Sequence, residues 1–152
     1  MSAADSFARA RARAYAVLPA PVRRFVPETA LGFAAISGTT YAIDLTLLAL
    51  LFDVFGWPYP VAVTTGYVVA FGLAFVLNRW LNFQSHGPLG RQTGRYVVTV
   101  VANYLLFILA LSTTLEALGV HYLAARLIAG ACEAVFMYVM MRTYVFRLKR
   151  YT

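Results

Sequence analysis

Four long apolar segments constrain this chain more than any other feature of its sequence. Each contains about 20 residues or more, which is the length that a helix needs to cross the hydrocarbon core of a bilayer. They lie at about residues 30–52, 60–82, 96–117 and 122–146. Because backbone N–H and C=O groups cannot stay unpaired in lipid, such segments are predicted to be helices. The sequence therefore predicts an all-α, polytopic membrane protein with four transmembrane helices.

The composition agrees with a bilayer as the surroundings of the chain. Of the 152 residues, 61% are hydrophobic and 12% are charged, about half the charged fraction of a typical soluble domain. The net charge of +7 comes from basic residues that flank apolar segments, so anionic lipid is the expected partner and nucleic acid is not. The single cysteine, Cys132, excludes an intrachain disulfide. No Cys/His metal pattern is present, so neither a metal nor another cofactor is expected.

The basic residues also predict the orientation of the chain. They gather in the N-terminal segment, in the loop between the second and third apolar segments, and in the C-terminal tail. The turn at 53–60 contains none, and the connection at 118–121 contains only His121. The positive-inside rule then places both termini on the cytoplasmic side of the cell membrane.

Three parts of the chain follow from this pattern: a basic N-terminal segment, a four-helix membrane domain and a short basic tail, at residues 1–29, 30–148 and 149–152. The N-terminal segment has two readings, which are an interfacial helix lying on the lipid headgroups and a disordered basic tail.

The second and fourth apolar segments end in related sequences. Phe75-Val76-Leu77-Asn78-Arg79-Trp80-Leu81-Asn82-Phe83 closes the second, and Arg142-Thr143-Tyr144-Val145-Phe146 closes the fourth, 63 residues later counted from Arg79 to Arg142. This predicts two hairpin repeats that enter the membrane with the same orientation, so a repeat axis would run along the membrane normal.

The two arginines at these ends are candidate phosphate ligands. Phe83 and Phe146 each follow an arginine by four residues, which sets Arg79 and Arg142 somewhat below the membrane surface. A guanidinium there fits the bidentate acceptors of a phosphate. Arg95, at the start of the third segment, is a third candidate. The alternative is that these arginines only obey the positive-inside rule.

Asn78 joins this candidate site because of the helix face on which it lies. Gly66, Ala70 and Ala74 form a stripe of small residues at a spacing of four, and such a stripe lets two helices approach closely. Asn78 continues the stripe, so its side chain is expected to face inward.

Ionisable groups inside a membrane are costly and therefore candidate functional residues. Asp44 and Glu133 are predicted to lie in the outer half of the bundle, roughly 12–16 Å below the outer surface at 1.5 Å per residue. Arg126 and Asn103 are weaker members of this set. Arg126 is close enough to the surface to snorkel, and the common task of a residue such as Asn103 is an interhelical hydrogen bond.

Over about residues 24–148 the sequence resembles the GtrA-like family of small four-helix membrane proteins. The resemblance is carried by Gly38 and Asp44 in the first segment and by the two end motifs, Phe75…Asn78-Arg79…Phe83 and Arg142 to Phe146. The chain departs from the family where Leu81 and Tyr144 replace a frequent tryptophan and where Met141 replaces an asparagine. Its basic N-terminus lies outside the family pattern.

The resemblance implies a function. It suggests that the protein moves a polyprenyl-phosphate-linked monosaccharide across the membrane for cell-envelope glycosylation. Arg79 and Arg142 would then contact the phosphate, and Asp44 and Glu133 would be candidates for binding sugar hydroxyls or coupling to protons. Two alternatives stay open: a scaffold that recruits a membrane glycosyltransferase, and a small proton-coupled exporter. Four helices make a thin pathway, so a homo-oligomer or a partner subunit is also considered. An enzyme is not expected, because no hydrolase, metalloprotease or phosphate-loop motif is present.

Overall fold

The computed structural model describes residues 2–147, apart from a few side chains, and the described residues form helices, turns and loops with no strand. The chain divides into two compact units, Met1–Gln84 and Ser85–Thr152. The prediction of an all-α protein is confirmed. The predicted C-terminal tail at 149–152 lies outside the described residues.

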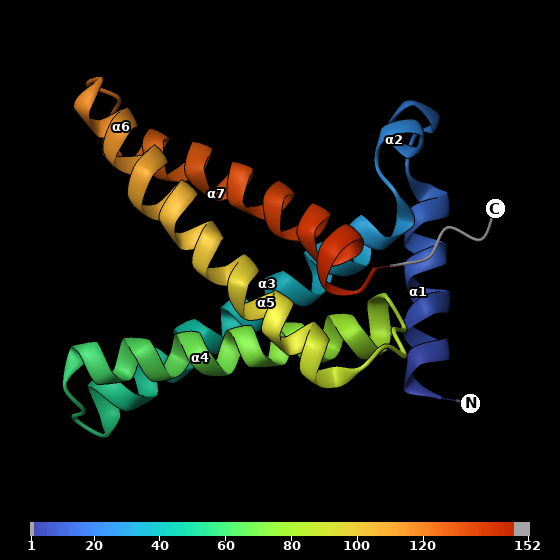
Figure 1. Cartoon of the computed structure of the whole chain (residues 1–152), viewed down its shortest axis with the longest axis horizontal. Helices are drawn as coiled ribbons and strands as arrows, with labels where there is room; N and C mark the ends of the chain where they lie inside the picture. Colours follow the sequence, from blue (N-terminus) through green and yellow to red (C-terminus); the bar gives the residue numbers. More distant parts are fainter. Residues whose placement is uncertain (1, 148–152) are drawn as a thin grey trace. The chain divides into compact units, whose positions relative to one another are not determined.

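The first unit is a helical hairpin with two short helices before it. The hairpin consists of α3 (Glu28–Ala49) with its π-helical end η1 (Leu50–Val54), and α4 (Tyr59–Leu77) with its π-helical end η2 (Asn78–Asn82). The two long helices pack side by side (Figure 1). Helix α1 (Ala3–Val17) lies across the end of the hairpin, against η2 and α3 (Figure 1), and α2 (Ala20–Phe25) links α1 to α3.

The second unit is also a hairpin. Its first arm is α5 (Leu89–Asn103), continued by the π-helical segment η3 (Tyr104–Leu111) and by α6 (Ser112–Ala117). Its second arm is α7 (Tyr122–Met140), which ends in η4 (Met141–Val145). The turn between the arms contains Gly119 at φ 79°, a left-handed conformation that glycine adopts without a steric penalty.

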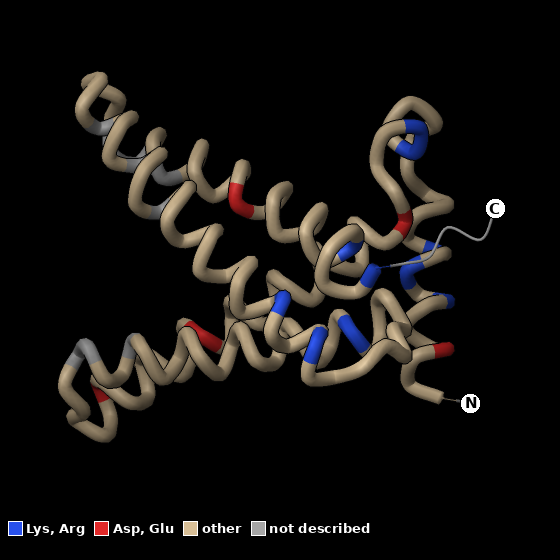
Figure 2. The backbone as a smooth tube through the Cα atoms, in the orientation of Figure 1, with Lys and Arg blue, Asp and Glu red and all other residues tan. Residues whose placement is uncertain are grey.

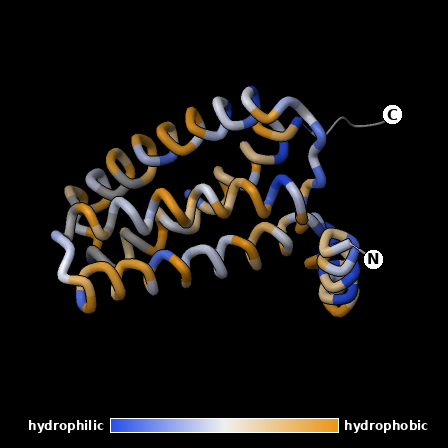
Figure 3. Tube along the Cα trace, turned by 90° about the horizontal axis from the view of Figure 1, so that it is seen from below, coloured by the Kyte–Doolittle hydropathy of each residue, from blue (hydrophilic) through white to orange (hydrophobic). Residues whose placement is uncertain are grey.

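In the described part of the chain, three helical stretches are long and apolar enough to cross a membrane: Glu28–Val54, Leu89–Leu115 and Leu127–Val145. The second predicted span corresponds to α4 and η2, which together run from Tyr59 to Asn82. Figure 3 shows how much of the hairpin helices is hydrophobic, whereas α1 carries hydrophilic residues. Four spans in two related repeats remain a prediction.

The loop predicted between the second and third apolar segments is shorter in the structure. Helix α5 begins at Leu89, with Pro88 immediately before it. Pro88 is the N-cap residue: its carbonyl accepts a hydrogen bond from the Gln92 N–H (3.1 Å), and its missing N–H costs no helical hydrogen bond. Gly90 and Gly94, which the sequence predicts to lie in the loop, are both helical. Arg95 consequently lies inside α5 and not at its start.

The stripe of small residues lies on the packed face of α4, as predicted. Gly66, Ala70 and Asn78 are buried, whereas Val68 and Val76 on other faces are 62% and 53% exposed. Exposed large apolar side chains continue along the second unit, including Leu105, Leu109, Leu127 and Val135. Helices that bury small residues and expose large apolar ones suit a hydrocarbon environment.

Helix α1 has a defined N-terminal cap. The Asp5 N–H donates to Ser2 Oγ (3.1 Å), and the Ser2 N–H donates to the Asp5 carboxylate (3.0 Å). These bonds satisfy two otherwise unpaired donors of the first turn, and they hold the pKa of Asp5 below its ordinary value. Residues 3–17 are thus helical, and the position of this helix on the lipid headgroups stays a prediction.

The ends of the two hairpins match residue by residue at the offset of 63. The Phe83 N–H donates to the Asn78 carbonyl (2.8 Å), and the Phe146 N–H donates to the Met141 carbonyl (2.9 Å). Each phenylalanine is 4% exposed. The residues that follow, Gln84 and Arg147, both have positive φ, at 45° and 39°. A left-handed residue at this place commonly marks the end of a helix.

Candidate functional site

Asn78 and Asn82 lie one turn apart in η2 and form a buried polar pair. Asn78 is fully buried and Asn82 is 3% exposed. The Asn82 Nδ2 group donates to Asn78 Oδ1 (3.1 Å), and Asn78 Nδ2 donates to the Ala74 carbonyl (2.9 Å). The inward orientation predicted for Asn78 is thus observed. These bonds mean that Asn78 supports the η2 turn from inside.

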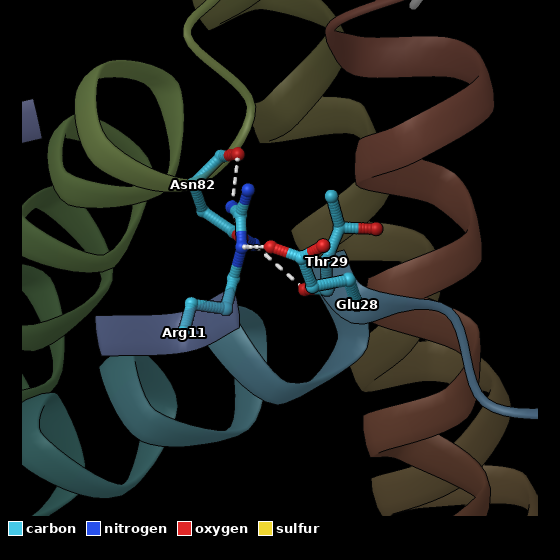
Figure 4. A network of polar contacts seen from close by, with 4 residues as sticks. All are labelled: Arg11, Glu28, Thr29 and Asn82. Carbon is cyan, nitrogen blue, oxygen red and sulfur yellow. Dashed lines mark hydrogen bonds and ion pairs between the residues drawn. The ribbon is translucent and has the colours of Figure 1, made fainter. Parts of the chain in front are cut away.

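Arg11 connects this pair to the N-terminal helix (Figure 4). Its Nη1 donates to the Asn82 carbonyl (2.8 Å) and to Asn82 Oδ1 (2.9 Å). Its Nε donates to Glu28 Oε1 (2.9 Å), forming a salt bridge in which the arginine side chain is 14% exposed. Asn82 Nδ2 also donates to the Thr29 carbonyl (2.9 Å). Three elements, α1, α3 and η2, therefore meet in one polar cluster.

Gly32 makes room for this cluster on α3. A Cβ atom at this position would collide with Asn82 Oδ1 and would lie 3.0 Å from Arg11 Cδ. A larger residue there would displace the amide that Arg11 binds. A Cβ atom at Gly38, on the same helix, would have no heavy atom within 4 Å, so the need for glycine is local to Gly32.

The arginines of the two end motifs occupy the second position of their turns. Arg79 follows Asn78 in η2, and Arg142 follows Met141 in η4. Both are half-buried. Arg142 Nη1 donates to the hydroxyl of Tyr138, one turn earlier (3.3 Å). Since a guanidinium carries five N–H donors, that single bond leaves most of its donors for another acceptor.

Arg95 approaches the same turn of the second unit from α5. Its Nη1 donates to the Tyr144 carbonyl (3.2 Å), and its guanidinium carbon lies 5.3 Å from the centre of the Tyr144 ring. Among the residues that the structure describes, neither Arg95 nor Arg142 is paired with a carboxylate. The second unit therefore brings two predicted phosphate ligands to η4, and no carboxylate among the described residues pairs with either.

Asp44 faces the neighbouring helix at the start of the small-residue stripe. A Cβ atom at Gly66 would lie 2.6 Å from Asp44 Oδ1 and 3.2 Å from its carbonyl oxygen. Only glycine leaves the space that this carboxylate occupies. Asp44 is half-buried, and its side chain makes no hydrogen bond to another described residue.

The other predicted intramembrane polar residues belong to the second unit. Asn103 is fully buried at the end of α5, and neither its Nδ2 nor its Oδ1 has a hydrogen-bond partner in the described part of the chain. The expected interhelical bond is therefore not seen there. Glu133 on α7 is half-buried and also without a described partner. The side chain of Arg126 lies outside the described residues.

Figure 2 shows the charges along each hairpin. Within the described residues, the turns that join α3 to α4 and α6 to α7 carry no Lys or Arg, as the sequence predicts (Figure 2). No group of three or more His, Cys, Asp and Glu side chains among these residues could hold a metal ion.

Sequence reasoning missed the Arg11 cluster. Arg11 and Asn82 are 71 residues apart, and Arg11 differs in no visible way from Arg9 and Arg13 on the same helix. Asn82 offered one usable signal, because it follows Asn78 by four residues and so lies on the same inward face.

A model of the GtrA/DPMS transmembrane domain family matches residues 32–146. This range covers both hairpins apart from the first turn of α3, and it excludes α1 and α2. No curated protein matches the chain. Because the matched range is most of the chain, the protein belongs to the GtrA/DPMS transmembrane domain family, in agreement with the end motifs at Asn78–Phe83 and Arg142–Phe146.

Proposed function

We propose that this protein translocates a polyprenyl-phosphate-linked monosaccharide across the cytoplasmic membrane for cell-envelope glycosylation. Membership of the GtrA/DPMS family indicates a part in handling sugar-carrying lipids at a membrane. The proposal of translocation rests on one observation: each of the two matching turns has a half-buried arginine at its second position, Arg79 in η2 and Arg142 in η4.

The phosphate of the lipid is the group that these turns suit. Arg142 and Arg95 bring two guanidiniums to η4 without a described carboxylate partner, and each has donors to spare. Charge-assisted, bidentate bonds from such groups to a phosphate are about twice as strong as neutral hydrogen bonds. In this proposal Asn78 does not touch the phosphate directly. It holds the turn that presents Arg79.

The sugar would pass polar side chains inside the membrane. Asp44 lies against Gly66 in the first unit, and Asn103 and Glu133 belong to the second. Asn103 supports this step most directly, because a fully buried amide without a partner costs about 1–3 kcal/mol and a sugar hydroxyl could satisfy it. Both termini would face the cytoplasm, and the second copy or partner subunit that a four-helix pathway invites would complete the route.

Lipid that copurifies with the protein tests this proposal. Mass spectrometry of the purified protein is expected to find polyprenyl phosphate or its glycosylated form. The double variant Arg79→Lys/Arg142→Lys keeps both charges but loses the planar guanidinium, whose paired N–H donors fit two phosphate oxygens at once. It should therefore retain about ten-fold less of this lipid, which corresponds to about 1.4 kcal/mol of binding free energy. Arg23→Lys/Arg24→Lys, on exposed α2, is the matched control. Recovery of bulk phospholipid alone would contradict the proposal.

A scaffold for a membrane glycosyltransferase is the second candidate. It is favoured by α1 and α2, which lie outside the family match and expose Val17 and Phe25 to 86% and 81%. A scaffold does not need acidic groups inside the hairpins. If Asp44→Asn and Glu133→Gln leave glycosylation in cells unchanged while Phe25→Ala abolishes it, the scaffold is the better account.

A further inference from the structure

The chain builds the same turn in two chemically different ways. In η2 the two inward positions are Asn78 and Asn82, whereas the corresponding positions of η4 are Met141 and Val145. All four side chains are at most 3% exposed. Both turns end in the same way. Each has the helix-ending hydrogen bond, the buried phenylalanine, and a residue of positive φ after that phenylalanine. The turn therefore does not require a polar interior.

The polar pair in η2 must then serve something other than the turn itself. A buried pair of hydrogen-bonded amides stabilises a fold no better than apolar residues of the same shape would. What the pair adds is a connection: through Asn82 it receives two hydrogen bonds from Arg11. Arg11 in turn is fixed by Glu28 at the start of α3. The connection ties α1 to the turn that carries Arg79.

We propose that Arg11 is a positioning residue for Arg79. Helix α1, which carries Arg11, then belongs to the candidate phosphate site of the first unit. This inference rests on the proposed function for its consequence in lipid binding, but not for its structural content. Arg11 clamps the carbonyl and the side chain of Asn82, three residues after Arg79, and so fixes the direction in which η2 presents the Arg79 guanidinium. In the second unit Val145 replaces Asn82 and offers no side-chain acceptor, and Arg95 donates only to the backbone carbonyl of Tyr144.

Loss of the clamp has a defined structural effect. Without Arg11, the buried Oδ1 and backbone carbonyl of Asn82 lose their donor, and η2 can relieve this only by opening toward water. The amides of residues 78–84 should then exchange with solvent faster, and Trp80 within η2 should change its environment. The opposite turn of the hairpin, which contains Trp57, should not change.

Hydrogen exchange and fluorescence on the full chain in nanodiscs test the clamp without any substrate. Arg11→Ala is expected to raise amide exchange in residues 78–84 about ten-fold, the scale of one hydrogen bond to a charged group, and to shift Trp80 emission in a Trp57→Phe background. Arg9→Ala and Arg13→Ala remove the same charge from exposed positions of the same helix and should change neither. Equal effects of all three variants would overturn the inference.

A variant that copies the second unit keeps the test valid if Arg11→Ala fails to fold. Asn78→Met/Asn82→Val gives η2 the interior of η4, so the turn should form without its clamp. Arg11→Ala added to this variant should then have a smaller effect on exchange than in the unmodified protein, because Asn82 Oδ1 is already absent and only the backbone carbonyl of residue 82 is left for Arg11. An equally large effect of Arg11→Ala in both backgrounds would show that Arg11 acts elsewhere.

Binding of a short-chain polyprenyl monophosphate to the same nanodiscs separates this inference from the proposed function. Arg11→Ala should weaken binding about ten-fold, and Arg11→Lys, which keeps the charge but not the three-bond geometry, should recover only part of it. If the unmodified protein does not bind the lipid but Arg11→Ala still loosens η2, the proposed function fails and the clamp stands. If the lipid binds equally well to the unmodified protein and to Arg11→Ala, the positioning role fails.

Discussion

At the scale of single residues, two glycines determine where the polar groups of the first hairpin lie. Gly66 accommodates Asp44, and Gly32 accommodates Asn82. In both cases the neighbour is a polar oxygen that would have to move if a methyl group were added. Small residues thus do more here than bring helices together, because they also fix the positions of an acid and an amide inside the unit.

The first prediction concerns Gly66. Gly66→Ala should be less stable than Gly72→Ala by about 1–3 kcal/mol, the usual cost of overpacking. Both changes gain the same helix propensity, but of these two glycines only Gly66 has a neighbour within 4 Å of the place that a Cβ would take. Thermal unfolding in detergent measures the difference. Equal melting temperatures would show that Asp44 does not lie on Gly66.

The second prediction concerns Gly32. Gly32→Ala should release the Arg11 clamp by displacing Asn82, so amide exchange in η2 should rise as it does for Arg11→Ala. Gly38→Ala, on the same helix in open space, is the matched control. A rise in both variants would mean that the effect belongs to α3 as a whole and not to the clamp.

At the scale of elements, the features that recur along each helix were predictable and those that depend on distant contacts were not. The helices and the inward face of Asn78 follow from apolar length and from the spacing of Gly66, Ala70 and Ala74. The π-helical ends depend on backbone hydrogen bonds such as the one from the Phe83 N–H to the Asn78 carbonyl, which no periodicity reveals. The early start of α5 was hidden by Gly90, because an isolated glycine signals a loop more often than a helix.

The third prediction uses the strained residue that ends η2. Gln84 has a φ of 45°, a conformation that costs a residue with a side chain about 1 kcal/mol and glycine nothing. Gln84→Gly should therefore raise the melting temperature by about 2–4 °C, and Gln84→Val should lower it. Arg147→Gly offers the same comparison in the second unit. A fall in stability with glycine would contradict the left-handed conformation.

At the scale of the whole molecule, the sequence predicts two hairpins in the same orientation, and the structure supplies two compact units with matching ends. The equivalence of the units is not complete. The first carries the Arg11 cluster at its end, whereas the second carries Arg95 and Arg142. The arginines at the two ends were enough to predict the repeat from the sequence. The difference between the units depends on contacts between residues that are far apart in the chain: 71 residues for Arg11 and Asn82, and 49 residues for Arg95 and Tyr144.

The fourth prediction concerns orientation. In a Cys132→Ser background, single cysteines at Ser85 and His121 should react with an impermeant maleimide from opposite sides of the membrane, Ser85 from the cytoplasm and His121 from outside. The physical reason is the positive-inside rule applied to the basic loop and tail. Labelling of both positions from one side would rule out the predicted topology.

The central claim is that the protein moves a lipid phosphate by means of its two end-motif arginines, and transport in proteoliposomes tests it most directly. Vesicles containing the protein and a fluorescent short-chain polyprenyl-phosphate monosaccharide are expected to exchange the lipid between leaflets faster than protein-free vesicles. Arg79→Ala/Arg142→Ala should remove this acceleration, while Arg23→Ala/Arg24→Ala should retain it. Exchange no faster than in protein-free vesicles, or unchanged exchange in the Arg79/Arg142 variant, would contradict the account.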